Sequence, residues 1–244
     1  MQQREKLRIV CGIHPVEAML KSKLKVDKLI LLNSAQKNKF RNILELASQR
    51  QISIEWMGER KELDALTNEQ NHQGVAALMK TEAQYYALDE VKDARLLLML
   101  DHITDDRNFG AILRSVDLLG VDAVIIPQDR ASQINEAVIR SSSGAAFFTK
   151  IVRVVNLSQA LEQLKDYGFW SYAAVGLGGE SVRQVQFARQ SVLILGNEGE
   201  GISDRLLKNS DFKITIPSAG NIDSFNVSVA AAILLYEASA QLRK

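Results

Sequence analysis

Residues 191–238 read SVLILGNEGEGISDRLLKNSDFKITIPSAGNIDSFNVSVAAAILLYEA, and this stretch predicts how the second half of the chain folds. It holds two short apolar runs, 192–195 and 212–216, and each run ends in a polar loop that contains glycine. A nearly all-apolar run, 227–236, follows the second loop. The pattern indicates two buried strands whose loops meet at one edge of an α/β sheet, which is where open sheets of this class bind ligands.

Composition is typical of a globular protein rather than of a membrane or disulfide-rich one. The chain has 244 residues, of which 46% are hydrophobic and 24% charged, and this usage is ordinary. No apolar run approaches the length of a membrane span, and the N-terminus has no secretory signal. We therefore expect a cytoplasmic protein with no membrane partner. A single cysteine, Cys11, and three scattered histidines predict neither an internal disulfide nor a metal site.

Positive charge is concentrated in the first third of the chain. Residues 1–80 carry 14 Lys and Arg against 9 Asp and Glu, whereas residues 81–244 carry 16 against 20. One short segment, in which Asp27 is the only acid, contains Lys21, Lys23, Lys25, Lys28, Lys37, Lys39 and Arg41. Such asymmetry suggests that the first part faces a polyanion such as RNA. A solvated lysine-rich surface would give the same pattern, so charge alone leaves both interpretations open.

Helical and extended patterns alternate in residues 1–80, which we expect to form a small α/β domain. The predicted elements are a helix over 12–20, a strand over 26–32, a helix over 39–51, and strands over 52–57 and 74–79. Residues 81–94 are polar and weakly periodic, and we predict a linker there.

A second α/β domain is predicted for residues 95–244. Its elements are strands over 95–100, 123–126, 150–155 and 169–175, and helices over 108–119, 135–143 and 157–166, followed by the stretch quoted first. Continuous apolar strands between helices indicate a mostly parallel sheet that is covered by helices on both faces.

Two of the loops that follow these strands carry unusual polar residues. In the first loop, Asn108 can cap the next helix, and Arg114 in that helix offers a forked donor that suits phosphate. Taken alone, this loop is better interpreted as the start of an ordinary capped helix with one surface arginine. The second, residues 196–201 (GNEGEG), has neither the G-x-G-x-x-G order nor a P-loop lysine. Its Glu198 and Glu200 would repel a pyrophosphate, so the loop better suits a neutral or cationic ligand.

A third loop precedes the apolar run 227–236, which has apolar or small residues on nearly every face and so predicts a helix buried in the protein or against a partner chain. Ser224 or Asp223 is expected to cap this helix. A capping role would explain one of Ser224 and Asn226, but not the presence of both polar residues next to a buried segment. The glycine-rich residues 176–179 (GLGG) are interpreted as a plain turn.

Together these loops resemble the three signature motifs of the SpoU (TrmH) family of RNA 2′-O-ribose methyltransferases. The matching segments are 108–115 (NFGAILRS), 195–201 (LGNEGEG), 216–220 (IPSAG) and 224–230 (SFNVSVA), and 140–145 (RSSSGA) resembles a further family segment. Residues 12–18 (GIHPVEA) and 72–75 (HQGV) resemble the ribosomal protein L30e-like domain of the branch that methylates large-subunit rRNA, the RlmB-like branch. Three positions depart from the family pattern: Asp106 stands for proline, Ser218 for methionine and Phe225 for leucine.

The resemblance implies a SPOUT-type C-terminal domain with a deep trefoil knot, S-adenosylmethionine as cofactor, no metal, and a homodimer formed through that domain. It assigns cofactor binding to Gly196, Asn197, Gly201, Ile216 and Phe225. It assigns catalysis to Asn108, Arg114, Glu198, Ser224 and Asn226. Because an arginine keeps its proton, we expect Arg114 to hold the RNA phosphate and stabilise the developing alkoxide, with Glu198 orienting Arg114.

The predicted function is methyl transfer from S-adenosylmethionine to a ribose 2′-OH in structured RNA, with a guanosine of large-subunit rRNA as the expected target. One alternative is a tRNA or adenosine-specific rRNA enzyme of the same family; the complete N-terminal domain disfavours the tRNA enzyme. Another is a non-catalytic RNA-binding module, which would have no need of the five polar residues assigned to catalysis.

Overall fold

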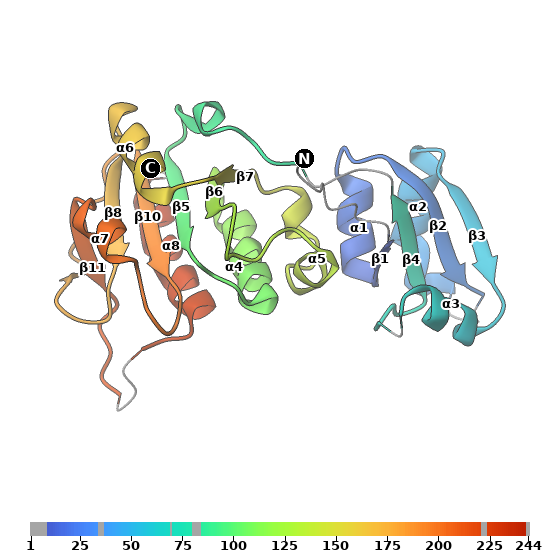
Figure 1. The fold of residues 1–244 in the computed structure, drawn as a ribbon. Coiled ribbons are helices and arrows are strands. Elements are labelled where there is room, and N and C mark those ends of the chain that lie inside the picture. Colours follow the sequence, from blue (N-terminus) through green and yellow to red (C-terminus); the bar gives the residue numbers. More distant parts are fainter. Residues whose placement is uncertain (1–8, 34–36, 69, 80–83, 221–223, 243–244) are drawn as a thin grey trace. The chain divides into compact units, whose positions relative to one another are not determined.

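The computed structural model describes residues 9–33, 37–68, 70–79, 84–220 and 224–242, and the chain divides into two α/β units (Figure 1). The small unit comprises Met1–Ala83 and Gln133–Phe148. The large unit comprises Gln84–Ser132 and Thr149–Lys244. The second stretch of the small unit therefore comes from the middle of the predicted second domain.

The small unit has a four-stranded sheet in the order β1-β4-β2-β3, in which β2 and β3 are parallel and β4 is antiparallel to both of its neighbours. Its first elements are β1 (Ile9–Cys11), α1 (Ile13–Lys21), β2 (Val26–Leu32), α2 (Arg41–Gln49), β3 (Ser53–Met57), α3 (Arg60–Leu66) and β4 (Val75–Met79). Three consecutive residues of β2, Leu29, Ile30 and Leu31, are buried, and Ile30 packs in one cluster with Leu63 of α3. Because successive side chains of a strand point to opposite faces, both faces of the sheet are covered at this strand.

The predicted strand over 26–32 is confirmed, and the other predicted elements of the small unit exist with shifted ends. A 3₁₀ turn, Lys37–Phe40, precedes α2, so the α-helix itself begins after the predicted residue 39. The sequence prediction missed β1 and α3. The first has three residues, and the second buries only Leu63, so neither contains enough periods to be recognised.

The inserted stretch 133–148 packs closely on the small unit. It contains α5 (Glu136–Ser141), capped by Asn135, and a short 3₁₀ turn, Ala145–Phe147. Gly144 has φ of +86°, and a Cβ at this position would lie 2.3 Å from the Cβ of Ala18. Because α1 approaches so closely, only glycine fits there.

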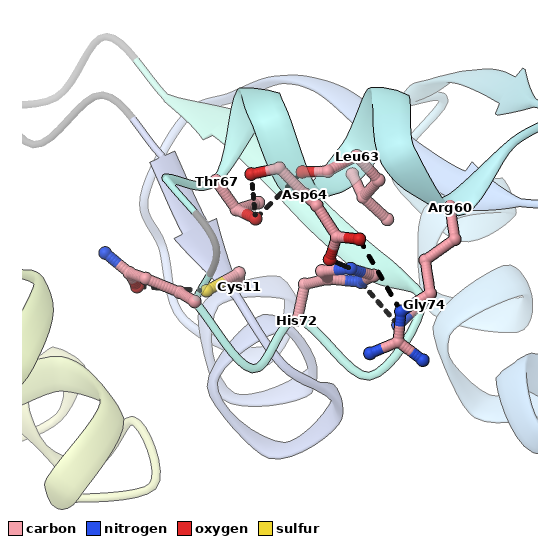
Figure 2. Close-up of polar contacts among 8 residues, drawn as sticks. Cys11, Arg60, Leu63, Asp64, Thr67, His72 and Gly74 are labelled. Carbon is pink, nitrogen blue, oxygen red and sulfur yellow. Dashed lines mark hydrogen bonds and ion pairs between the residues drawn. The ribbon is translucent and has the colours of Figure 1, made fainter.

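His72 fixes the turn that leads into β4 (Figure 2). Its ring is 1% exposed; Nε2 lies 2.8 Å from Asp64 Oδ1, and Nδ1 accepts a hydrogen bond from Gly74 N at 2.8 Å. Since Nδ1 accepts, the proton of the neutral ring lies on Nε2 and is donated to Asp64. Gln73 Oε1 in turn accepts from Ile13 N at the start of α1. The HQG residues of the family resemblance thus build a turn.

The large unit has a seven-stranded sheet in the order β7-β6-β5-β10-β8-β11-β9, and every pairing in it is parallel. Its strands are β5 (Leu96–Asp101), β6 (Ala123–Pro127), β7 (Ile151–Val154), β8 (Trp170–Ala174), β9 (Glu180–Ser181), β10 (Ser191–Gly196) and β11 (Phe212–Thr215). The predicted α/β class and parallel sheet are confirmed. Residues 84–94, in the predicted linker, pack on this unit: Tyr86 pairs with Val152, and Val91 is buried.

Helices cover both faces of the large sheet. They are α4 (Asp106–Leu119), α6 (Leu157–Asp166), α7 (Asp204–Lys208) and α8 (Val227–Leu242). α4 packs against α8, whereas α6 and α7 share a core cluster with alternate residues of the central strands. The predicted cap of α4 was wrong: Asp105, not Asn108, caps it, and the Asp105 side chain accepts from Asn108 N at 2.7 Å.

Candidate active site

The carboxyl ends of three adjacent strands enclose a cavity of about 760 Å³ in the large unit. Because β5, β10, β8 and β11 are parallel and in register, with Gly196 beside Asp101 and Ile214 beside Ala174, their following loops emerge at one edge. The cavity is lined by the ends of β8, β10 and β11 and by the start of α8. Its volume lies in the range of small-molecule and cofactor sites.

All five residues that the sequence assigned to cofactor binding line this cavity: Gly196, Asn197, Gly201, Ile216 and Phe225. Apolar side chains supply much of the remaining wall, with Leu195, Ile214 and Leu234 among them. The carboxylates of the wall belong to Glu198 and Glu200. A cavity with apolar walls and carboxylates suits a ligand that is largely neutral with a positive centre.

The loop after β10 folds back tightly on itself. Gly201 N donates to Asn197 O at 3.1 Å, and Asn197 Oδ1 accepts from the backbone of Gly199 and Glu200 at 2.9 and 2.7 Å. A Cβ on Gly196 would lie 2.0 Å from the backbone carbon of Gly201. The Asn197 side-chain oxygen therefore shapes the loop, and the absence of a Cβ at residue 196 lets the two ends of the loop meet.

A polar network joins three of the residues that the sequence assigned to catalysis. Glu198 Oε1 accepts hydrogen bonds from the side-chain nitrogens of Asn108 and Asn226 and, at 3.2 Å, from Val227 N. Asn226 Nδ2 also lies 3.1 Å from Asn108 Oδ1. Since Val227 begins α8, the carboxylate lies at the positive end of that helix, where negative charge is stabilised.

The cap of α8 differs from the prediction. Ala230 N donates to Asn226 O at 2.9 Å, and Asn226 Oδ1 accepts from Ser228 N at 3.0 Å, so Asn226 occupies the cap position. Ser224 lies earlier, is exposed and lines the cavity. Asp223, the other predicted cap, lies outside the described residues.

Arg114 lies on the exposed side of α4, six residues after Asn108 and therefore about 9 Å further along the helix axis. Glu198 Oε1 contacts Asn108, Asn226 and the start of α8. The orientation of Arg114 by Glu198 stays a prediction. At the N-terminus of the same helix, Asp106 Oδ1 accepts from Ser132 Oγ. The aspartate that replaces the family's proline is thus held within the large unit.

Sequence reasoning missed two parts of this site. The first is the end of β8, where Val175 and Gly176 line the cavity although the loop was interpreted as a plain turn. Glycines after an apolar strand were a usable signal there. The second is Asp101, which is 1% exposed and accepts from Ser203 N at 2.7 Å, so that it ties the far end of the β10 loop to β5.

Among the described residues, no group of three or more His, Cys, Asp or Glu side chains is arranged to hold a metal ion. Within the same part of the chain, no helix is both long and apolar enough to cross a membrane.

Two family models match the chain, in the same order as its two halves. The SpoU rRNA methylase family matches residues 95–236. The model described as RNA 2′-O ribose methyltransferase substrate binding matches residues 9–85. A relative from Staphylococcus epidermidis, named for the TrmH family of tRNA/rRNA methyltransferases, is 34% identical over 94% of both chains. A tRNA/rRNA methyltransferase of Borreliella burgdorferi, named as uncharacterized, is 36% identical over 84% of this chain and 94% of its own.

Solved structures share the fold over most of the chain. The SpoU methyltransferase AviRb from Streptomyces viridochromogenes, crystallised with AdoMet, has a TM-score of 0.77, 24% identity, and coverage of 96% of this chain and 89% of its own. A TrmH/SpoU tRNA modifying enzyme of A. aeolicus has a TM-score of 0.55 and 31% identity over 63% of this chain and 81% of its own. By the family model that covers residues 95–236 and by relatives at least a third identical, the chain belongs to the SpoU (TrmH) family of RNA methyltransferases.

Proposed function

We propose that this protein transfers a methyl group from S-adenosylmethionine to a ribose 2′-OH of structured RNA, with a guanosine of large-subunit rRNA as the target. The observation that carries the proposal is the position of Glu198. This residue lines the cavity, and its carboxylate also accepts hydrogen bonds from Asn108 and Asn226. A cofactor pocket and a polar acceptor site thus share one carboxylate.

The cavity fits S-adenosylmethionine in size and chemistry. Apolar walls and backbone groups of the β8, β10 and β11 loops suit the adenosine, and the carboxylates of Glu198 and Glu200 tolerate a sulfonium cation. When bound, the cofactor supplies an activated methyl group. Gly196, Asn197, Gly201, Ile216 and Phe225 would hold it, with Val175 and Gly176 added by the β8 end.

The acceptor side of the site is assigned to Arg114, Asn108, Ser224 and Asn226. Arg114 keeps its proton, so its part is to hold the RNA phosphate and to stabilise negative charge on the ribose oxygen as the proton leaves. The network fixes Asn108 and Asn226 before RNA binds, which lowers the cost of placing the ribose against the methyl group.

The small unit supplies recognition of RNA, and the large unit supplies a contact between two copies of the chain. The first assignment is supported by the substrate-binding model over residues 9–85. The second is supported by α8, which is apolar on nearly every face and leaves Val229 and Tyr236 45% and 63% exposed. We infer a homodimer that acts in the cytoplasm.

Replacement of Arg114 by alanine tests the reaction. We expect Arg114→Ala to lower methyl transfer to in vitro transcribed large-subunit rRNA by about 100-fold or more, because the variant has no donor to stabilise the developing charge. Binding of S-adenosylmethionine, measured by calorimetry, should stay within about twofold of wild type, since Arg114 does not line the cavity.

The matched control is Arg107→Ala, which removes an exposed arginine from the same helix and should retain transfer. Normal transfer by Arg114→Ala would contradict the mechanism. Failure of the wild-type protein to bind the cofactor would instead favour a non-catalytic RNA-binding module. Mapping of the labelled product by nuclease digestion assigns the methyl group to a ribose or a base.

A further inference from the structure

The loop that joins α1 to β2 carries a concentration of positive charge that the site in the large unit does not use. We define the lysine loop as residues 21–25; it contains Lys21, Lys23 and Lys25, and all three are exposed. Between Glu17 and Glu45 the sequence contains a single acid, Asp27. The loop is therefore a strongly basic part of the surface of the small unit.

Arg50, which follows α2, holds the backbone of the lysine loop in one conformation. Its Nη1 donates to the carbonyl oxygens of Met19, Leu20 and Ser22 at 3.3, 2.7 and 3.1 Å, and its Nη2 donates to Leu24 O at 2.5 Å. These acceptors include carbonyls at the end of α1 that have no partner within the helix. The planar guanidinium reaches several carbonyls at once, which a lysine at this position could not do.

The loop is further closed by its own serine. Ser22 Oγ donates to Met19 O at 2.7 Å and accepts from Leu24 N at 3.3 Å. Two carbonyls of the loop, those of Ser22 and Leu24, and two at the end of α1 are thus held by Arg50. The loop is therefore preorganised, and binding of a ligand does not require further loss of backbone entropy to order it.

Stabilisation of α1 does not account for all of this charge. A cation near the C-terminus of a helix interacts favourably with its dipole, but the effect fades beyond the last turn. Arg50 and Lys21 already lie at that end. Lys23 and Lys25 come after the helix, so its dipole does not account for their charges.

We propose that the lysine loop is a surface through which the small unit holds the phosphate backbone of structured RNA, and that Arg50 is its positioning residue. The proposal rests on the proposed function and adds where on the small unit the RNA lies. Lysine ammonium groups on an ordered backbone bind phosphates without regard to base sequence, and base identity must then be read elsewhere.

Salt-dependent RNA binding tests the surface. The triple variant Lys21→Gln, Lys23→Gln, Lys25→Gln should bind in vitro transcribed large-subunit rRNA about tenfold more weakly or worse. The slope of log affinity against log salt should become shallower by roughly 2, because each phosphate that a lysine neutralises adds about 0.7 to 0.9 to that slope.

The control removes the same charge elsewhere. Lys61→Gln, Lys92→Gln, Lys208→Gln neutralises three exposed lysines outside the loop and should leave the slope near that of wild type. Equal reductions of affinity in the two triple variants would show that only net charge matters and would overturn the proposal.

The variant Arg50→Lys tests positioning, because it keeps the charge and removes the fork. We expect RNA affinity to fall by about threefold to tenfold, with a shallower salt slope, at temperatures where circular dichroism shows a folded protein. A purely structural Arg50 would lower the melting temperature but leave the salt slope of the folded protein unchanged, and that result would overturn its assigned role.

Methyl transfer separates this proposal from the proposed function. At saturating RNA, the Lys21/Lys23/Lys25 variant should transfer methyl groups at the wild-type single-turnover rate, since the loop acts in binding alone. If wild type binds RNA through the loop but transfers no methyl group, the proposed function is wrong and the lysine loop is still an RNA-binding surface. If wild type transfers methyl groups and the variant binds RNA as tightly as wild type, the lysine loop is not the RNA-binding surface and the proposed function is retained.

Discussion

Glu198 shows how one carboxylate can connect segments that are far apart in the sequence. Its Oε1 holds Asn108 of α4, Asn226 before α8 and the backbone of Val227. The sequence indicated these polar residues as a set through their motifs. It did not indicate which of them touch, because contacts between loops depend on the order of strands in the sheet rather than on spacing along the chain.

Asp211 provides a prediction at the scale of one residue. Its carboxylate ties the start of β11 to β8 and α6: Oδ1 accepts from Lys165 Nζ at 2.6 Å, and Oδ2 accepts from Ser171 N and Oγ at 2.9 and 2.6 Å. Although burial raises the pKa of Asp211, the hydrogen bonds from Lys165 and Ser171 outweigh it and lower the pKa below its ordinary value. The ionised form therefore stabilises the folded state.

We expect Asp211→Asn to reduce the free energy of unfolding by about 1–2 kcal/mol at neutral pH. A lowered folded pKa contributes stability above the unfolded pKa, near 3.9, and that stability disappears as pH falls through the folded pKa. The difference in free energy of unfolding between wild type and Asp211→Asn should consequently shrink below about pH 4. Urea unfolding at several pH values measures this difference. The control is Asp166→Asn, which changes an exposed acid of α6. A difference that grows on acidification would contradict the assignment.

At the scale of elements, the loop after β10 is constrained by its two ends. A Cβ on Gly196 would lie 2.0 Å from the backbone carbon of Gly201 and 2.1 Å from its oxygen, and backbone atoms cannot rotate away as a side chain does. We expect Gly196→Ala to force the loop open and weaken S-adenosylmethionine binding by about tenfold or more in calorimetry.

Gly199→Ala is the matched control in the same loop. A Cβ there would lie 3.6 Å from Asn197 Oδ1, an ordinary contact distance, so cofactor affinity should stay close to that of wild type. Equal affinity of the two variants would show that closure of the loop does not shape the cavity.

Most elements of the large unit could be predicted because buried parallel strands are continuous apolar runs. The predicted helix over 157–166 and α6 coincide, and both β10 and β11 were found with their loops. The contribution of β8 to the cavity was not predictable in the same way. Gly176 joins the site only because β8 lies between β10 and β11 in the sheet, although it precedes both in the chain.

At the scale of the whole molecule, the exposed face of α8 predicts self-association. Val229 and Tyr236 are seven residues apart, so they lie on one side of the helix. We expect the wild-type chain of 27.1 kDa to have about twice that mass in light scattering, and Tyr236→Glu to shift it towards the monomer, because a buried charge destabilises an apolar contact.

Val155→Glu serves as the control, since it places the same charge on an exposed apolar residue just beyond β7. A Tyr236→Glu protein that keeps the mass of the wild-type dimer would place the contact elsewhere.

The assignment of residues to the two units could be predicted only in part. Charge and composition separated a basic N-terminal region from the rest, and the family motifs supplied its expected role. That residues 133–148 pack with the first region was not visible, because α5 follows β6 in the chain and has the same pattern as any helix between parallel strands. The trefoil knot implied by the resemblance stays a prediction for the same physical reason: threading leaves no periodic trace in a sequence.

The packing of residues 133–148 on the small unit has a consequence for folding on the ribosome. Chains emerge from the N-terminus, and an N-terminal domain generally folds before its successors are made. Here the surface of α1 around Ala18 meets Gly144 only after β5, α4 and β6 have been synthesised. The small unit therefore cannot be completed when its N-terminal stretch emerges, and its maturation depends on translation continuing past Phe148.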